Sequence, residues 1–291
     1  MSQWMLLVQP TSSLTSHFDR WFFALPGAIW ILSGIMVLIA IGSYVTGQLT
    51  VGGAFGAFVV GFLPTWILGF GSLVTLMFFF IATGILSKIS KQLRQVDVEK
   101  IHQKVGRRDL FQVLANGLMA LIAALLFAWS QQSAYLIMFG AAIGEAASDS
   151  FASEVGILSK QKPISIITGR PMDRGLSGAI SPLGLVAALL GALLVGLVAS
   201  SSFFELGTQA IRATSTITLA ALFGCLLDSV LGITLQAHYW DEATKRVTEK
   251  PVIDNRVLPL KRGVRWIDND MVNLISNISA ALLALGLAMI F

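Results

Sequence analysis

Long apolar stretches separated by short polar segments run through most of this chain. A helix needs about 20 apolar residues to cross the hydrocarbon layer of a membrane. On that measure, the pattern predicts eight membrane-spanning helices, over residues 21–46, 51–63, 66–87, 111–129, 134–155, 178–199, 211–236 and 271–291. We therefore expect an all-α polytopic membrane protein, with a short N-terminal extension over residues 1–20 and a single transmembrane domain over residues 21–291.

The second and third predicted spans are separated only by Pro64 and Thr65. Residues 51–63 are short for a full crossing, so two alternatives are open: a re-entrant hairpin, or one helix kinked at Pro64 in a protein of seven spans. Eight crossings place the three basic loops on the same face, whereas seven would move the first of them to the opposite face. We therefore expect the second span to be separate from the third.

Positive charge is concentrated in the three predicted loops over residues 88–109, 157–177 and 237–270. They contain seven, four and seven Lys or Arg residues, and so hold eighteen of the twenty in the chain. Short cytoplasmic loops of membrane proteins collect Lys and Arg. We therefore expect these loops in the cytoplasm and the N-terminus outside, with the plasma (inner) membrane as the location if the source is prokaryotic.

The composition agrees with a membrane protein and narrows its partners. Hydrophobic residues make up 55% of the 291 positions and charged residues 12%, far from the balance of a soluble domain. The net charge of +4 follows from basic loops beside anionic headgroups, so we expect membrane lipids and no nucleic acid as partners. The single cysteine, Cys225, excludes an intrachain disulfide and a thiolate metal cluster. A homo-oligomer is left open.

Small residues recur on several predicted spans, among them Gly52 and Gly56 on the second and Gly224 and Gly232 on the seventh. Small residues let helix backbones approach closely in a membrane. We expect these glycines to pack helices together.

Carboxylates within the predicted spans are the first functional candidates. Glu145, Asp149 and Glu154 lie on the fifth span, and Asp228 lies on the seventh. A carboxylate at such depth is costly and usually faces a protein interior, a cavity or a cation. Glu145 and Asp149 share a helix face, whereas Glu154 points roughly half a turn away. An interfacial charge is therefore as good an explanation for Glu154 as a catalytic role.

Two other spans begin with a polar stripe of one spacing. The stripes are Asp109, Gln112 and Asn116 on the fourth span, and Asp270, Asn273 and Asn277 on the eighth. For Gln112 and Asn277 we expect hydrogen bonds between helices. The predicted topology places all these polar residues at the cytoplasmic face, beside the basic loops. Oxygen ligands without His or Cys favour a hard cation such as Mg²⁺ with phosphate groups.

The loop over residues 157–177 has two interpretations. Thr168, Gly169 and Arg170 combine a hydroxyl, a flexible backbone and a guanidinium, and Ser177 and Gly178 lead into the sixth span. Because helix N-termini attract anions, the loop is a candidate phosphate site. The alternative is a plain polar linker with Ser177 as the helix N-cap.

Five segments of the chain resemble motifs of one known family. They are GRRDLFQVLANG (106–117), GEAASDSFASEVGILSKQKP (144–163), ITGRP followed by GLSGAIS (167–181), LLDSVLGITLQ (226–236) and RWIDNDMVN (265–273). In this order they resemble the integral membrane family that includes transmembrane protein 19 and the phytyl-phosphate kinases of tocopherol synthesis, itself similar to phytol and dolichol kinases. The resemblance runs from about residue 49 to the C-terminus.

The resemblance implies an isoprenyl-phosphate kinase, with a nucleoside triphosphate, expected to be CTP, as donor, an isoprenyl monophosphate lipid as acceptor and Mg²⁺ as cofactor. With the polar stripes, it predicts catalytic roles for Asp149, Glu154 and Asp228 and metal binding by Asp149, Asp228, Asp268 and Asp270. The predicted substrate- and nucleotide-binding residues are Arg107, Arg108, Asn116, Thr168, Gly169, Arg170, Ser177, Gly178, Asn269 and Asn273.

The chain departs from the family pattern near its acidic motif. Many relatives have Asn where this chain has Ala147, and Ser150 and Phe151 replace Thr and Trp. With Ala147 the chain lacks this side-chain amide, and we expect the loss to change which metal or substrate is preferred.

Two other functions use the same residues. One is a transporter or flippase of an anionic lipid or solute, because intramembrane carboxylates also mark coupling-ion sites, and Asp-Ser recurs at Asp149-Ser150 and Asp228-Ser229 as in a parallel repeat. The other is a CTP-dependent lipid cytidylyltransferase, which would release pyrophosphate.

Overall fold

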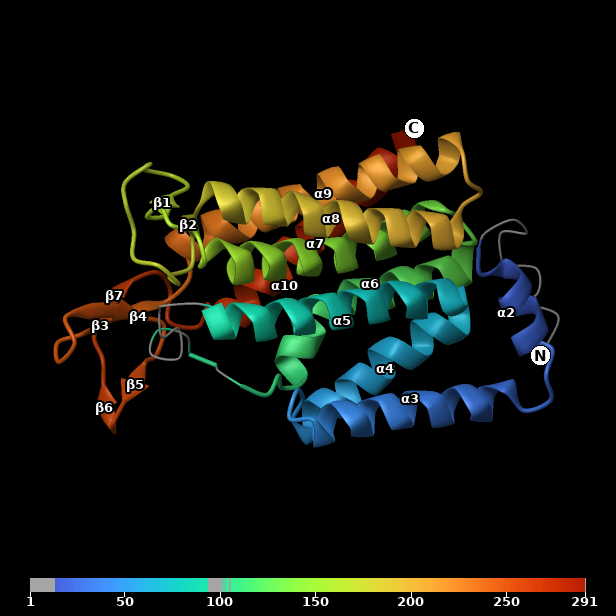
Figure 1. The fold of residues 1–291 in the computed structure, drawn as a ribbon, viewed down its shortest axis with the longest axis horizontal. Coiled ribbons are helices and arrows are strands. Elements are labelled where there is room, and N and C mark those ends of the chain that lie inside the picture. Colours follow the sequence, from blue (N-terminus) through green and yellow to red (C-terminus); the bar gives the residue numbers. More distant parts are fainter. Residues whose placement is uncertain (1–13, 94–100, 102, 105, 291) are drawn as a thin grey trace.

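The computed structural model describes residues 14–93, 101, 103, 104 and 106–290, and within them eight long helices form one bundle, preceded by a short helix (Figure 1). The helices are α2 Ser16–Phe23, α3 Ala28–Val45, α4 Val51–Leu68, α5 Phe70–Leu93, α6 Leu110–Ser130, α7 Ala134–Gly156, α8 Pro182–Phe203, α9 Thr208–Thr234 and α10 Asn269–Ile290. Seven of the long helices are apolar enough to cross a membrane. The eighth is α7, which carries three carboxylates. The predicted helical membrane fold is confirmed.

Successive long helices run in opposite directions along the bundle (Figure 1). The loops that follow α5, α7 and α9 therefore lie at one end, which we call the loop end, and α2 and the last turn of α10 lie at the other. Since these three loops are the basic ones, the alternation expected from their charge agrees with the fold. The membrane side that each end faces stays a prediction.

The second and third predicted spans are separate helices, but their predicted boundary at Pro64 and Thr65 is wrong. Pro64 lies inside α4. The alternative of one kinked helix through both spans is also wrong, because α4 ends at Leu68 and α5 begins at Phe70. The chain breaks instead at Gly69, whose φ of 83° and ψ of −173° suit glycine. At 18 residues, α4 is long and apolar enough to cross.

Two other spans begin later than predicted. The first starts at Ala28, because Pro26 and Gly27, with φ +77°, interrupt the helix after α2. The sixth starts at Pro182, because Ser181 is its N-cap and accepts a hydrogen bond from the Gly184 amide at 3.1 Å. Proline is favoured at the first helical position. Ser177 is therefore not the N-cap.

Short antiparallel strands structure the two longer basic loops, which the apolar pattern could not reveal. Strands β1 Ile164–Ser165 and β2 Ala179–Ile180 pair after α7. After α9, β3 His238–Asp241 lies between β4 Arg246–Thr248 and β7 Leu260–Arg262, while β5 Val252–Ile253 and β6 Arg256–Val257 form a separate pair. These strands cover the loop end of the bundle (Figure 1).

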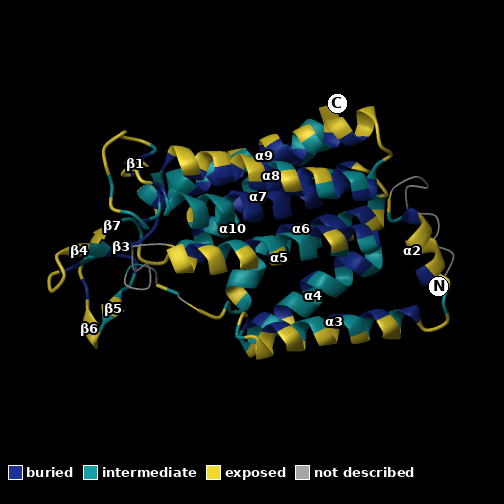
Figure 2. Cartoon of the chain, in the orientation of Figure 1, coloured by how far each residue is buried: buried dark blue, intermediate teal, exposed yellow. Residues whose placement is uncertain are grey.

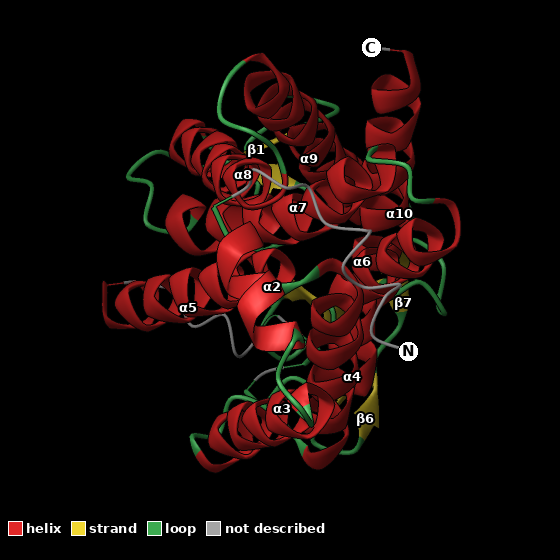
Figure 3. Ribbon diagram, turned by 90° about the vertical axis from the view of Figure 1, so that its right-hand side faces the viewer, coloured by secondary structure: helices red, strands yellow, loops and turns green. Residues whose placement is uncertain are grey.

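Helix α7 lies at the centre of the bundle and packs on α5, α6, α8, α9 and α10. Its residues 138–148 are all buried, and the exposed residues lie mainly on the outer faces of the other helices (Figure 2). The predicted packing role of the glycines is confirmed: a Cβ at Gly56 would lie 2.8 Å from Leu110 Cδ1, and one at Gly224 would lie 2.6 Å from Glu145 Cγ. Seen along the bundle, α3 and α9 lie on opposite sides (Figure 3).

A pair of helical glycines tests the contact between α4 and the start of α6. A Cβ at Gly53 would collide with the carbonyl oxygen of Arg108, whereas one at Gly34 on α3 would meet no atom within 4 Å. We expect Gly53→Ala to lower the free energy of unfolding by about 1–3 kcal/mol and Gly34→Ala to leave it unchanged or raise it slightly. Thermal unfolding in detergent measures both. Equal effects would contradict this account of the contact.

Candidate functional site

A polar cavity of about 260 Å³ lies at the loop end of the bundle, between α7, α8 and α9. Asp149 and Glu154 line it from α7, and Asp228 lines it from α9. The segment from Arg174 to Ser181 and Asn269 at the start of α10 complete the wall. The structure thus brings the three carboxylates with predicted catalytic roles to one cavity, while the roles themselves stay predictions.

Asp149 and Asp228 are close enough for their charges to repel each other. Asp228 is 9% exposed and Asp149 is half-buried. Two neighbouring carboxylates in a weakly solvated site favour the binding of a cation. Among the residues that the structure describes, no group of three or more His, Cys, Asp or Glu side chains is arranged to hold a metal ion. Mg²⁺ usually binds through one or two carboxylates together with waters and substrate phosphates, so the oxygen ligands of this pair are of the type that this ion prefers.

Glu145 lies one turn deeper on α7, where it is 1% exposed. Its Oε1 accepts a hydrogen bond from the Ser276 hydroxyl at 2.9 Å, and its Oε2 accepts one from Asn277 Nδ2 at 2.8 Å. Ser276 Oγ also lies 3.4 Å from Asp228 Oδ2. We call Glu145, Ser276, Asn277 and Asp228 the buried network, because it joins α7, α9 and α10 directly below the cavity.

The two polar stripes serve different purposes. Asn277 Nδ2 also donates to the carbonyl of Ala142 at 2.8 Å, so its predicted interhelical hydrogen bond is confirmed. Asn273, with its amide nitrogen turned toward α9, donates to Asp228 Oδ2 at 3.0 Å. The prediction for Gln112 is wrong: it forms a capping box with Asp109 at the start of α6. Asp followed three residues later by Gln is a sequence signature of a capping box, which our prediction did not use.

The four predicted metal ligands do not meet. Asp268 and Asp270 line a separate small cavity of about 30 Å³. Asp268 Oδ1 accepts from the Met271 amide at 3.1 Å and so caps α10. Asp270 Oδ2 accepts from Lys104 Nζ at 2.5 Å, and the same ammonium donates to Asp109 at 2.7 Å. The structure therefore gives Asp270 a cationic side-chain partner, and metal binding by Asp268 and Asp270 stays a prediction.

The charged pair of Lys104 and Asp109 lies outside the helices. Burial acts to lower the pKa of Lys104, but its contacts with Asp109 and Asp270 outweigh this and raise it above 10.5. Burial likewise acts to raise the pKa of Asp109, but Lys104 and the backbone amides of α6 outweigh this and lower it below 3.8. Both groups are thus held in their charged forms at neutral pH.

The predicted phosphate loop is divided by the structure. Thr168, Gly169 and Arg170 lie exposed on a turn, where the Gly169 amide donates to the Ser165 carbonyl at 2.9 Å, and they do not line the cavity. Arg174 lines it instead, and its Nη2 donates to the carbonyl of Lys160 at 2.8 Å. Arg174 was missed, although it directly precedes the glycine-rich segment that leads into α8.

Ser177 and Gly178 do line the cavity. Ser177 Oγ donates to Glu249 Oε1 at 2.5 Å, which ties the segment to the strand region. Gly178 has φ +82°, and a Cβ there would lie 2.6 Å from Ile233 Cβ and 2.7 Å from the Ser229 carbonyl. Only glycine allows this close approach of the segment to α9.

The two neighbouring arginines before α6 differ in their surroundings. Arg107 lies over the ring of Tyr44, 5.4 Å from its centroid, away from the polar cavity. Arg108 is half-buried. Burial lowers the pKa of the Arg108 guanidinium, and the Glu154 carboxylate opposes this shift. Asn116 lies two turns into α6 and lines a second cavity together with Arg108.

Comparison with known proteins places this site in a wider context. A family model described as "Integral membrane protein DUF92" matches residues 34–281. Protein PGR of Arabidopsis thaliana is 31% identical over 264 residues, which cover 83% of this chain and 90% of that protein. An uncharacterized membrane protein of Methanocaldococcus jannaschii is 34% identical over 62% of this chain and 71% of its own length. An uncharacterized membrane protein of Synechocystis is 26% identical over 95% and 96%. No solved structure matches the chain significantly.

Asn277 tests the buried network. Asn277→Ala removes the donor to Glu145 Oε2 and leaves a carboxylate oxygen unsatisfied inside the bundle, which costs about 1–3 kcal/mol. The control is Ser279→Ala, because Ser279 bonds within its own helix, to the Ile275 carbonyl. We expect a clear drop in unfolding temperature for the first variant and little change for the second. Similar values for both would show that the network does not hold α10 in place.

Lys104 tests the charged pair. Asp109, with its lowered pKa, adds stability above about pH 4 that is lost on acidification, and Lys104, with its raised pKa, adds stability below about pH 10 that is lost at higher pH. Lys104→Met should therefore cost about 1 kcal/mol at neutral pH and flatten both limbs of the stability profile. Lys160→Met, at an exposed loop position, serves as the control. Unfolding temperatures across pH measure the effect.

Proposed function

Since the chain belongs to the integral membrane family DUF92, we propose that it is an isoprenyl-phosphate kinase that uses CTP at the cytoplasmic face of the membrane. The resemblance of five motifs to the phytyl-phosphate kinases supplies the reaction and the substrate class. The observation that carries the proposal is the polar cavity, where Asp149, Glu154 and Asp228 meet Arg174 and the glycine-rich segment before α8.

In this proposal Asp149 and Asp228 hold Mg²⁺ together with the triphosphate of the nucleotide. When bound, the ion neutralises charge on the phosphoryl oxygens. Arg174 and the segment around Ser177 and Gly178 bind the remaining phosphate oxygens. Phosphoryl transfer depends mostly on positioning and on charge neutralisation, so a site of carboxylates, arginine and backbone amides is chemically sufficient.

The transfer needs no strong base from the protein. An anionic oxygen of the lipid monophosphate attacks the γ-phosphorus of CTP, and a new phosphorus–oxygen bond forms. The bond from the γ-phosphorus to the bridging oxygen breaks, and CDP leaves with that oxygen. Arg108 neutralises the lipid phosphate. The charge of Glu154 acts on the Arg108 guanidinium, so we assign Glu154 a positioning role.

Purified protein, Mg²⁺, geranylgeranyl phosphate and CTP labelled on the γ-phosphate separate the candidate functions. The kinase predicts a labelled lipid diphosphate and CDP. A cytidylyltransferase would give a CDP-linked lipid and labelled pyrophosphate. Unchanged CTP in protein that still binds the lipid would contradict the kinase and favour a transporter.

Asp149 and Asp228 provide the mutational test. Asp149→Ala and Asp228→Asn should each reduce turnover at least about a hundredfold. Each removes a proposed ligand of the ion that would stabilise charge on the transferring phosphoryl group. Asp254→Asn is the control, because Asp254 has a side chain that is 84% exposed at the tip of the β5–β6 pair. Unfolding temperatures show that the variants are folded. Retained turnover in Asp149→Ala would remove this residue from the site.

A further inference from the structure

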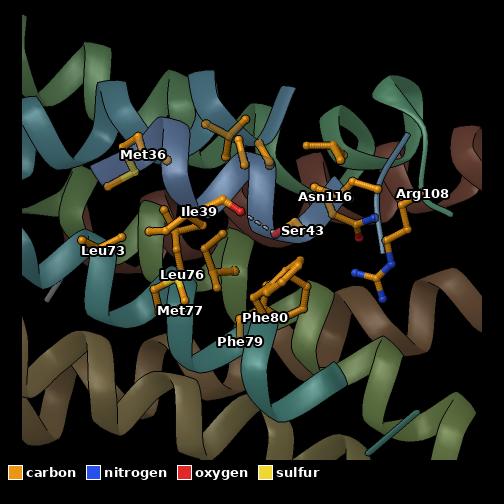
Figure 4. A pocket seen from close by; sticks show the side chains of 18 of the residues that line it. Met36, Ile39, Ser43, Leu73, Leu76, Met77, Phe79, Phe80, Arg108 and Asn116 are labelled. Atoms are coloured by element: carbon orange, nitrogen blue, oxygen red, sulfur yellow. Dashed lines mark hydrogen bonds between the residues drawn. The ribbon is translucent and has the colours of Figure 1, made fainter. Parts of the chain in front are cut away.

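A second cavity, of about 110 Å³, lies between α3, α4, α5 and α6 (Figure 4). Its walls are apolar over most of their length, with Met36 and Ile39 contributed by α3 and Leu76 by α5. Arg108 and Asn116 lie together at one end, away from Met36 (Figure 4). The cavity is thus apolar along most of its walls and cationic at one end.

The cavity extends along α3. Its lining on α3 extends from Met36 to Ser43, which corresponds to about 10 Å along a helix. Ala40, Ala57 and Gly61 line it and keep it open. Both α3 and α5 pack on α4.

The cationic end is built into the fold. The Arg108 amide donates to the Gln48 carbonyl at 2.9 Å, and its own carbonyl accepts from the Thr50 amide at 3.0 Å. These bonds fix the backbone at the mouth of the cavity. Among the described residues, no side chain forms a hydrogen bond with the guanidinium, and the carboxylate that acts on its charge is Glu154. Glu154 lines the polar cavity, and Arg108 lines the apolar one.

We propose that this second cavity holds the part of the isoprenyl chain next to its phosphate, with the phosphate bound by Arg108. The inference rests on the proposed kinase function and adds the position of the lipid to it. A small apolar cavity suits one chain better than the two of a glycerophospholipid, and the single arginine at its end matches one phosphate. The phosphate is then presented to the polar cavity, where the nucleotide binds.

The test measures binding of labelled geranylgeranyl phosphate to protein in lipid nanodiscs without nucleotide, so that it does not depend on turnover. Ala40→Trp fills the cavity from α3. Val37→Trp adds the same side chain to the same helix at a position that is 43% exposed. We expect Ala40→Trp to weaken binding about tenfold or more, because methylene groups of the lipid chain would no longer be buried in the cavity. Val37→Trp should leave binding unchanged.

A second pair of variants tests the headgroup. Arg108→Gln should abolish the preference for geranylgeranyl phosphate over geranylgeraniol, whereas Arg246→Gln, at an exposed position of β4, should keep it. Competition with phosphatidic acid distinguishes the source of the phosphate. Displacement by phosphatidic acid as readily as by geranylgeranyl phosphate would overturn the assignment to an isoprenyl chain.

The outcomes separate the two proposals. Equal binding by Ala40→Trp and Val37→Trp would overturn the cavity assignment even if the protein transfers phosphate. Specific loss in Ala40→Trp and Arg108→Gln, in a protein that does not turn over CTP, would support the cavity and contradict the kinase. Loss of both binding and turnover in Ala40→Trp, with both retained in Val37→Trp, would support the two together.

Discussion

A carboxylate buried inside a membrane bundle must find hydrogen-bond donors, and this requirement shapes the centre of the protein. Glu145 takes its donors from Ser276 and Asn277 on α10, and Gly224 on α9 leaves the space for its side chain. Three helices are thereby fixed relative to one another at one level of the bundle. Because Ser276 also contacts Asp228, the position of a cavity carboxylate follows from how Glu145 is satisfied.

Helix α7 has a different role at each of two depths in the bundle. The buried part of α7 fixes the packing, and its last turns carry Asp149 and Glu154 to the polar cavity at the loop end. Arg108 lines the separate apolar cavity. The protein therefore carries both a polar and an apolar cavity, each lined by one arginine.

Much of this arrangement could be predicted from local sequence patterns. The apolar runs predicted the eight long helices, and the spacing of Glu145, Asp149 and Asp228 indicated an interior site, because a carboxylate in a membrane has few alternatives. Contacts between distant segments could not be predicted: Lys104 pairs with Asp270 across 166 positions, and nothing local distinguishes Arg174 from Arg170. The boundary at Gly69 was misplaced because Pro64 is tolerated within α4.

The positive charge of the basic loops agrees with the predicted topology, and the individual cations differ in their surroundings. The number of positive residues in these loops suits one membrane face, but several of the described cations have partners at the protein surface: Lys104 is held by two carboxylates, Arg107 lies over Tyr44, and Lys261 lies over Trp240. Arg174 lines the polar cavity, and Arg108 lines the apolar one. The described cations of the basic loops are therefore divided between partners at the surface and the walls of the two cavities, and their placement follows from the fold instead of from net charge.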